Sequence, residues 1–277
     1  MADKKTYLKI LEGGKELILR VMDFHLPLIQ KNLQDQIFFQ WDLLNEDEKY
    51  LATHGVKVTS NVQTDFRNDM SEALAEISSA AIDNAMNDIG LKRITLAEKE
   101  NSLFSNAKLD KLNTMPSSVR KRIEAQSELF TDSIIGDYTK NAFVVFNANW
   151  QMEKAAVNKA LDESSLDFIS GVMIGRGADI QSAQIVNESR NAVFLSDEAQ
   201  SEVEAFQFWN PNDDRTTPLC SHLAGQIFSA DDPNFWKYQP PLHFNCRSTY
   251  LPLKALPEGK EISILELPEG LQEQIQF

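Results

Sequence analysis

The chain has 277 residues, of which 42% are hydrophobic and 25% are charged, a composition that is typical of globular proteins and excludes wholesale disorder. Its formal net charge of −14 excludes a broad basic face, so we expect no strong nucleic-acid binding. No stretch reaches the ~20 apolar residues that a membrane-spanning helix needs, and the N-terminus lacks the apolar core of a signal peptide. We therefore expect a protein that is made in a cytoplasm and has no membrane anchor.

The first 58 residues carry apolar side chains near helical spacing and predict helix. The clearest helix follows, with Ser60 as its N-cap and Gly90 just past its end. Its apolar residues recur every three or four positions: Val62, Phe66, Met70, Leu74, Ile77, Ala81, Ala85 and Ile89. Such a long apolar face packs within a bundle of this chain or against a partner protein, and the pattern leaves both open.

The next part of the chain is less regular. Residues 91–115 are polar and predict a connector, and Phe143–Phe146 fits either a buried strand or a helix. The segment Gly175-Arg176-Gly177 predicts a turn between short helices. It is not a phosphate-binding loop, because it lacks the Lys-Ser/Thr pair that such a loop requires. Further helices are predicted from Pro116 onward, over 152–161 and over 178–190.

The pattern changes near Val203. Residues 203–209 alternate apolar and polar side chains, which predicts a strand. Asn210 to Asp214 is a turn cluster, and the chain up to Pro252 shows few helix signals. The sequence therefore predicts an α+β protein in three parts: a mainly α-helical region over 1–178, a small α+β module over 179–256 and a tail over 257–277.

Both cysteines and two of the four histidines lie close together in this module. Cys220 and His222 form one pair, and His243 and Cys246 form a second pair after a loop of twenty residues. Two short pairs of thiol and imidazole ligands are typical of a tetrahedral zinc site, so the metal we expect is a structural Zn²⁺. Three alternatives stay open: buried cysteines and histidines without a metal, a Cys220–Cys246 disulfide, and a Cys220–His243 nucleophile pair.

An enzyme is the less favoured interpretation of these residues. A thiol hydrolase would use Cys220 and His243, oriented by Asp214 or Asn245, but no nucleophile-elbow signal is present. A zinc hydrolase would need a general base, and Glu188, Asp213 and Asp214 are the candidates. None of the three lies in a His-Glu-x-x-His-like motif. We therefore expect no catalytic residues.

A longer motif surrounds the four candidate ligands. It consists of Asp213-Asp214-Arg215-Thr216-Thr217-Pro218-Leu219-Cys220, then Leu223-Ala224-Gly225, then Pro240-Pro241-Leu242-His243-Phe244-Asn245-Cys246-Arg247. This motif resembles the C-terminal domain of phage minor head proteins similar to the F protein of bacteriophage Mu, which are also called head morphogenesis proteins. In that family the pattern is Asp-x-Arg-Thr, a Cys, Leu-x-Gly, and Pro-Pro-x-His-x-x-Cys-Arg. Upstream, Glu188 corresponds to the Glu of a Thr-Glu-Thr-type segment.

The sequence departs from the family pattern at two positions. Many members have Cys-x-x-Cys where this chain has Thr217 to Cys220, so one thiol ligand is missing. We expect His222 to replace it. Phe244 stands where proline is usual, which matters little for metal binding.

The remaining motif residues are expected to have structural roles. Asp213 either forms a buried ion pair with Arg215 or caps the turn that follows it. Arg247 is expected to hold a carboxylate of the protein itself through two hydrogen bonds. Gly225 and Glu188 complete the structural motif, and four aromatic side chains are expected to cover the small core around the site: Trp209, Phe235, Trp236 and Tyr238.

The resemblance implies a function in the phage particle. It implies a minor head (minor capsid) protein, present in few copies in the head interior or at the portal vertex, that acts in head morphogenesis, DNA packaging or DNA delivery. The implied partners are the portal protein and capsid or scaffold proteins, with the long helices as contact surfaces. The alternative from another class is a Cys/His- or zinc-dependent hydrolase or an injected effector.

Overall fold

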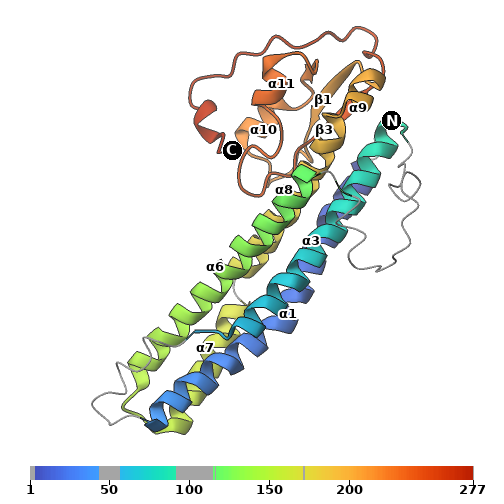
Figure 1. Ribbon diagram of the computed structural model, residues 1–277. Coiled ribbons are helices and arrows are strands. Elements are labelled where there is room, and N and C mark those ends of the chain that lie inside the picture. Colours follow the sequence, from blue (N-terminus) through green and yellow to red (C-terminus); the bar gives the residue numbers. More distant parts are fainter. Residues whose placement is uncertain (1–3, 44–56, 92–114, 116, 171, 277) are drawn as a thin grey trace, which may run out of the picture. The chain divides into compact units, whose positions relative to one another are not determined.

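A computed structural model describes residues 4–43, 57–91, 115, 117–170 and 172–276 (Figure 1). Long helices precede a small antiparallel sheet, which confirms the predicted α+β class. Most of the predicted connector, residues 92–114, and Pro116 lie outside the described residues. The elements in chain order are α1 Lys4–Leu43, α3 Ser60–Ile89, α6 Ser117–Asn149, α7 Lys154–Ser170, α8 Val172–Phe194, α9 Asp197–Glu202, β1 Ala205–Trp209, α10 Pro218–Leu223, β2 Ile227–Phe228, α11 Pro233–Lys237, β3 Thr249–Leu253 and the 3-10 helix η2 Gln272–Gln274.

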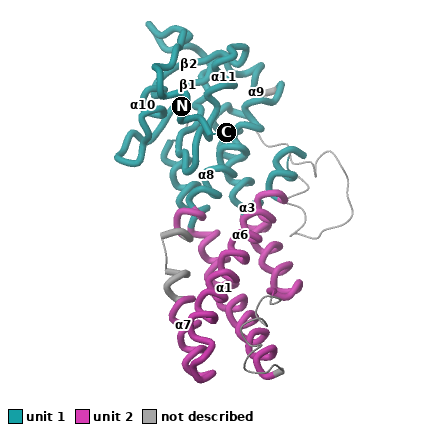
Figure 2. The backbone as a smooth tube through the Cα atoms, turned by 90° about the vertical axis from the view of Figure 1, so that its left-hand side faces the viewer, with its two compact units in different colours: residues 1–15, 74–123, 179–277 teal, residues 16–73, 124–178 magenta. Residues whose placement is uncertain are grey.

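The chain divides into two compact units (Figure 2). Unit 1 comprises residues 1–15, 74–123 and 179–277, and unit 2 comprises residues 16–73 and 124–178. The sheet and the motif therefore share a unit with the first residues of α1 and the second half of α3. The predicted division into 1–178 and 179–256 treats these helical segments as part of a separate region, whereas the compact units group them with the module.

Unit 2 is a helical core with apolar side chains at its centre. On α1, buried residues recur at helical spacing and are at most 1% exposed. The indole of Trp41 meets the ring of Phe146 edge to face, with centroids 5.2 Å apart. At the edge of this core Gln30 and Gln34 both donate to Asp162 Oδ1 at 2.7 Å. The buried α1 stripe in this unit is Ile18, Met22, Leu26, Ile29, Leu33 and Ile37.

The predicted helix over residues 60–90 is confirmed as α3, which runs from Ser60 to Ile89. Ser60 is its first helical residue rather than a residue before it. Gly90 follows the helix with φ +77°, a left-handed conformation that favours glycine at this position. Of the predicted stripe all but Val62 are buried, namely Phe66, Met70, Leu74, Ile77, Ala81, Ala85 and Ile89.

The predicted turn at Gly175-Arg176-Gly177 is wrong, because these residues lie inside α8. A glycine in a helix interior costs about 0.5–1 kcal/mol relative to alanine, which tertiary packing can outweigh. Here a Cβ on Gly177 would lie 3.1 Å from a ring carbon of Phe130, so the missing side chain allows α8 to approach that ring closely. The ambiguous segment Phe143–Phe146 is helical, as part of α6.

The first turns of α1 pack within unit 1 through a close backbone approach. A Cβ on Gly14 would collide with Oγ of Ser182 on α8 and lie 3.2 Å from Ile77 on α3. The Ser182 hydroxyl donates to the backbone oxygen of Leu11 at 2.8 Å. Glycine at position 14 is therefore what allows α1 to lie directly against α8 and α3 in this unit.

The sheet has the order β2-β1-β3 and is antiparallel throughout. Strand β1 confirms the strand predicted over 203–209. In its register Phe206 pairs with Phe228 on β2, and Phe208 pairs with Tyr250 on β3. The ring of Phe235 stacks on that of Tyr250 with centroids 4.8 Å apart. All five rings are buried, so the alternating side chains of β1 build the aromatic core of the module.

Two short helices in this module were missed by the sequence analysis. Both begin with the same local signal, a capping side chain followed by proline at the first helical position. Thr217 caps α10 ahead of Pro218, and Asp232 caps α11 ahead of Pro233. Among the described residues, none of the helices has the length and apolar character needed to cross a membrane.

Candidate metal centre

The first arm of the site is the start of α10. The hydroxyl oxygen of Thr217 accepts from the backbone N–H of Cys220 at 3.4 Å, which caps the helix. Residues three apart on a helix share a face, so the cap places the Thr217 and Cys220 side chains on the same side of α10. The side-chain amide of Asn210 donates to the backbone oxygen of Cys220 at 2.5 Å and ties α10 to the end of β1.

The second arm is the turn that precedes β3. The backbone N–H of Cys246 donates to the His243 oxygen at 3.1 Å and closes this turn. Asn245 adopts φ +59°, a left-handed conformation that asparagine tolerates better than most residues. The closed turn directs His243 and Cys246 toward α10.

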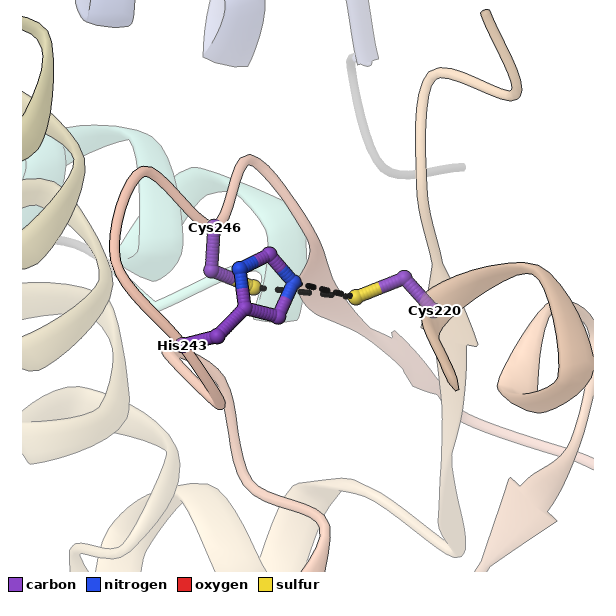
Figure 3. Close-up of side chains that lie close together, drawn as sticks. All are labelled: Cys220, His243 and Cys246. Carbon is purple, nitrogen blue, oxygen red and sulfur yellow. Dashed lines mark hydrogen bonds between the residues drawn. The ribbon is translucent and has the colours of Figure 1, made fainter. Parts of the chain in front are cut away.

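The two arms bring three side chains together (Figure 3). The sulfur of Cys220 lies 3.1 Å from Nε2 of His243 and 3.9 Å from the sulfur of Cys246. All three potential ligand atoms lie within 4.8 Å of one another. Both cysteines are buried and free, so the disulfide alternative is not formed in this structure.

The imidazole of His243 is oriented by its backbone. Nδ1 lies 2.9 Å from the oxygen of Phe244, and because a carbonyl only accepts, Nδ1 carries the proton. In the neutral ring Nε2 then holds the free lone pair, and it faces the two sulfurs. A backbone carbonyl that fixes the tautomer in this way is the usual support of a metal-binding histidine.

The charges of the three groups are coupled. The hydrogen bond from the Cys220 thiol holds the pKa of Cys246 well below its ordinary value, despite the burial of that sulfur. The same contact, together with burial, raises the pKa of Cys220. Burial lowers the pKa of His243, but the hydrogen bond to Cys246 and its charge outweigh this and raise it. These contacts favour the ionised form of Cys246, and a cation at the centre would also favour ionisation of Cys220.

The geometry of these three residues fits zinc. With Zn–S bonds of ~2.3 Å, two thiolates of a tetrahedral site lie ~3.8 Å apart, close to the 3.9 Å between Cys220 and Cys246. Two sulfurs and one imidazole nitrogen are also the donor set that zinc prefers. The three-residue group therefore has the donors and the spacing to hold a zinc ion, with both sulfurs buried away from solvent.

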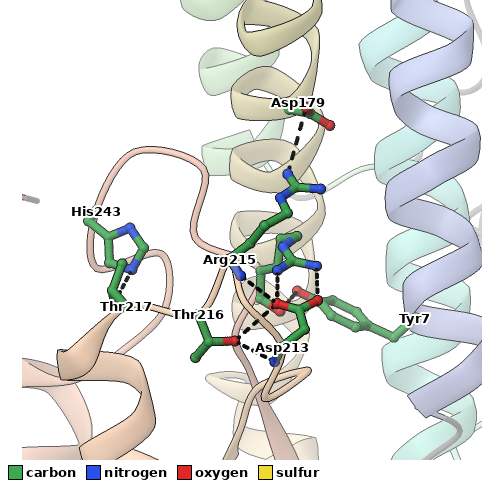
Figure 4. Close-up of polar contacts among 8 residues, drawn as sticks. Tyr7, Asp179, Asp213, Arg215, Thr216, Thr217 and His243 are labelled. Atoms are coloured by element: carbon green, nitrogen blue, oxygen red, sulfur yellow. Dashed lines mark hydrogen bonds and ion pairs between the residues drawn. The ribbon is translucent and has the colours of Figure 1, made fainter.

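The structure does not bring the fourth predicted ligand, His222, into this group. His222 lies on α10 outside the group, and its Nε2 is buried without a hydrogen-bond partner among the described residues. Cys220 and His222 are two residues apart, and residues at that spacing do not share a helix face. The hydroxyl of Thr217 lies beside His243 instead, with Oγ1 3.0 Å from Nε2 (Figure 4).

Comparison with known families identifies the segment that carries this centre. Residues 173–251 match the family described as Phage Mu protein F like protein. The C-terminal segment is Mu F-like. The match confirms the resemblance that the motif predicted and indicates a protein of phage head morphogenesis. Neither a curated protein nor a solved structure matches the chain.

Within the Mu F-like segment, Asp213 has a different partner from the one predicted. Its carboxylate accepts two hydrogen bonds from Arg247, at 2.9 and 2.5 Å, and the pair is partly exposed rather than buried. The guanidinium of Arg215 instead lies 3.7 Å from Asp179 (Figure 4). The internal carboxylate expected for Arg247 is thus Asp213, whose pKa these hydrogen bonds lower to about 2.

The alternative role predicted for Asp213, as a turn cap, is also present. Its Oδ1 accepts from the backbone N–H of Arg215 at 3.1 Å and from the hydroxyl of Thr216 at 3.3 Å. One carboxylate therefore closes the turn after β1 and holds the chain just beyond Cys246 through Arg247. This links the two arms of the candidate metal centre a second time.

Glu188 and Gly225 lie outside the group of three ligand atoms. Both carboxylate oxygens of Glu188 accept from Nε of Arg122 at 2.9 Å. Burial raises the pKa of Glu188 against the opposing effect of Arg122. Gly225 has φ +83°, and its N–H donates to the Phe208 oxygen at 2.8 Å where the chain turns from α10 into β2.

Of the four aromatic residues expected to cover the core, Phe235 and Tyr238 are buried, whereas Trp236 is 52% exposed. Trp209 meets Tyr7 edge to face, with centroids 5.9 Å apart. The sequence analysis missed Tyr7 itself, which is 1% exposed. Its hydroxyl lies 3.1 Å from the backbone oxygen of Ser248, directly after the second ligand arm. No local signal reveals a contact across 241 residues.

Arg190 is the other residue that sequence analysis missed. It is fully buried on α8, and its guanidinium pairs with Asp88 at 2.9 Å and also contacts the side chain of Asn84. Its Nε donates to the hydroxyl of Thr249 at 3.1 Å, at the first residue of β3. This charge therefore connects α3, α8 and the sheet inside unit 1.

Proposed function

We propose that this protein is a minor head protein of a phage particle, acting in head morphogenesis at or near the portal vertex. The observation that carries the proposal is the Mu F-like segment over 173–251, which contains all three converging ligands. The partners we propose are the portal protein and the capsid or scaffold proteins. A role in DNA packaging or delivery belongs to the same proposal.

Exposed apolar side chains in unit 2 support a role in protein contacts. On α1, Phe24 is 64% and Leu28 is 44% exposed, and the two lie one turn apart on the same face. On α6, Leu129 and Val144 are also largely exposed. Scattered apolar side chains are normal on a surface, but neighbouring ones favour a partner. We propose the α1 pair as a contact with another head protein.

The net charge supports a location inside the head. A chain of net charge −14 is repelled by packed DNA and does not adsorb to it. The proposed protein can therefore be enclosed with the genome without binding it. Retention of the purified chain on DNA at moderate salt would argue against this part of the proposal.

We propose that Cys220, His243 and Cys246 hold a zinc ion with a structural role. When bound, zinc cross-links the start of α10 to the turn before β3, and so fixes the two arms of the Mu F-like segment. The burial of both cysteines, which are at most 2% exposed, supports this role over that of a thiol nucleophile, which needs access to substrate.

Quantitative mass spectrometry of purified phage particles and procapsids tests the proposal. The amount of this chain is compared with the amounts of the portal and major capsid proteins. We expect a few copies per particle at a fixed ratio to the portal protein. Absence from both particles and procapsids would overturn the proposal and favour a hydrolase or an injected effector.

A further inference from the structure

We propose that the zinc site of this chain has only three protein ligands, and that its fourth position, beside Thr217, holds an exchangeable water. The inference rests on the proposed metal binding and goes beyond it, because the metal that cross-links the two arms would also be open to a further donor. A structural zinc site is closed by four protein ligands, whereas three ligands and a water leave the metal open to other donors.

The first step of the argument is the position of Thr217. Its side chain shares a face of α10 with Cys220, and its Oγ1 lies 3.0 Å from Nε2 of His243. It thus stands where a fourth ligand would complete the group. A neutral hydroxyl is not among the ligands that zinc ordinarily takes from proteins, which are thiolate, imidazole and carboxylate. Thr217 therefore occupies the ligand position without supplying a ligand.

The second step is the space beside Thr217. A recess of about 10 Å³ is lined by Thr217, Cys220 and His243, among other residues. This volume is close to the ~10–15 Å³ that one water needs. The recess reaches two of the three proposed ligands, so a water there lies next to the metal position.

The third step is that the recess offers partners for such a water. Asn210 and Asn245 both line it, and Oδ1 of each is buried without a hydrogen-bond partner among the described residues. Asn210 is 4% exposed, so bulk water does not satisfy it. A bound water needs two to four polar partners, and these two amide oxygens are unused acceptors on residues that line the recess.

The rival fourth ligand is His222. Its ring lies outside the group of three, and its position two residues after Cys220 turns it away from the face that Cys220 and Thr217 share. Recruiting it would require α10 to unwind, which would remove the cap that Thr217 provides. The geometry thus favours the open position over a site closed by His222.

The experiment uses the full chain loaded with Zn²⁺ or with Co²⁺, whose absorption bands report its ligands. Zinc affinity is measured by competition with a chromophoric chelator, and azide is added to the cobalt form as a small exogenous ligand. The variants are Thr217→Cys, which supplies a fourth thiolate, the matched control Thr217→Ser, which keeps the capping hydroxyl, and His222→Ala.

We expect azide to shift the cobalt bands of the unmodified chain and of the Thr217→Ser variant. The Thr217→Cys variant should bind zinc at least tenfold more tightly (roughly), because the added thiolate forms a fourth bond to the metal. It should also gain thiolate-to-cobalt intensity and lose the azide response. The His222→Ala variant should bind zinc as the unmodified chain does.

Two results would overturn the inference, and they differ in what they leave standing. If the unmodified chain binds metal, ignores azide and loses affinity on His222→Ala, the site is closed by His222 and only the open position is wrong. If neither the unmodified chain nor the Thr217→Cys variant binds zinc or cobalt, the proposed metal binding fails and the inference falls with it. The azide response of the unmodified chain decides the matter even if Thr217→Cys does not fold.

Discussion

Unit 2 and the Mu F-like part of unit 1 are stabilised in different ways. Unit 2 buries a regular apolar stripe, and its ion pairs Arg67–Asp132 and Lys154–Asp42 are at least one-third exposed on each side. Unit 1 buries a complete guanidinium at Arg190 and places Cys220, His243 and Cys246, the proposed metal ligands, between two short arms. A core of many similar apolar contacts tolerates change in small steps, whereas single polar groups cannot be replaced individually. Single substitutions of polar groups should therefore lower the free energy of unfolding more in the Mu F-like part of unit 1 than in unit 2.

The largest difference is expected at Arg190. Replacing Arg190 by Met removes the cation that pairs with Asp88, whose side chain is 5% exposed, and leaves that carboxylate buried. Breaking a buried pair from one side costs about 3–5 kcal/mol. The matched change in unit 2, Arg67→Met, breaks an exposed pair and should cost below about 1 kcal/mol. Urea unfolding measures both free energies, and equal losses would remove the distinction between the regions.

The next largest effect is expected from loss of the metal. Cys220→Ser should abolish zinc binding, measured by elemental analysis of the purified chain. It should also lower the free energy of unfolding by about 2.7 kcal/mol when free zinc is one hundred times Kd. Ser221→Ala, at the exposed neighbouring residue, is the control and should change neither quantity. Full zinc occupancy in Cys220→Ser would place the metal elsewhere.

The regular part of the fold could be predicted because its signals are local. The stripe of α3 repeats over thirty residues, and the alternation of β1 lies within one strand. The pairing of His243 with Cys246 follows from a single turn. Each of these patterns is visible within a short stretch of sequence, so each predicts its element without knowledge of the rest.

The errors have a common cause, which is that distant residues decide the outcome. The glycines at 175 and 177 suggest a turn, but the packing of Phe130 against Gly177 allows a helix. Tyr7 and Arg190 act through contacts more than one hundred residues away in sequence.

A smaller effect is expected from the hydroxyl of Tyr7. Tyr7→Phe leaves the backbone oxygen of Ser248 and the side chain of Asn187 without this donor in a buried place, which should cost about 1–2 kcal/mol. Tyr138→Phe in unit 2 loses part-buried contacts with the side chains of Gln30 and Ser165 and should cost less than about 1 kcal/mol. Thermal unfolding of the two variants side by side checks which one loses more stability. A larger loss of stability in Tyr138→Phe than in Tyr7→Phe would contradict this prediction.

The smallest effect is the acid dependence of Asp213. The hydrogen bonds from Arg247 lower its pKa from 3.8 to about 2, so the ionised form stabilises the folded state. This contribution is complete above about pH 4 and is lost as the pH falls toward 2. Because the Asp213 side chain is 40% exposed, we expect its ionised form to contribute less than about 1 kcal/mol to the free energy of unfolding.

Carbon-13 NMR of the Asp213 carboxyl group measures this directly. The titration midpoint should lie near 2 in the unmodified chain and move up toward the ordinary value in Arg247→Gln. An unchanged midpoint in that variant would show that Arg247 is not the group that lowers the pKa.

Hydrogen–deuterium exchange of the intact chain, with and without a zinc chelator, tests the central claim most directly. If a metal holds the two arms of the Mu F-like segment, chelation should accelerate exchange of the backbone amides in residues 205–253. The amides of residues 16–43 in unit 2 should be unaffected, because no proposed metal ligand lies in that segment. Unchanged exchange in 205–253, or equal acceleration in both regions, would contradict the account.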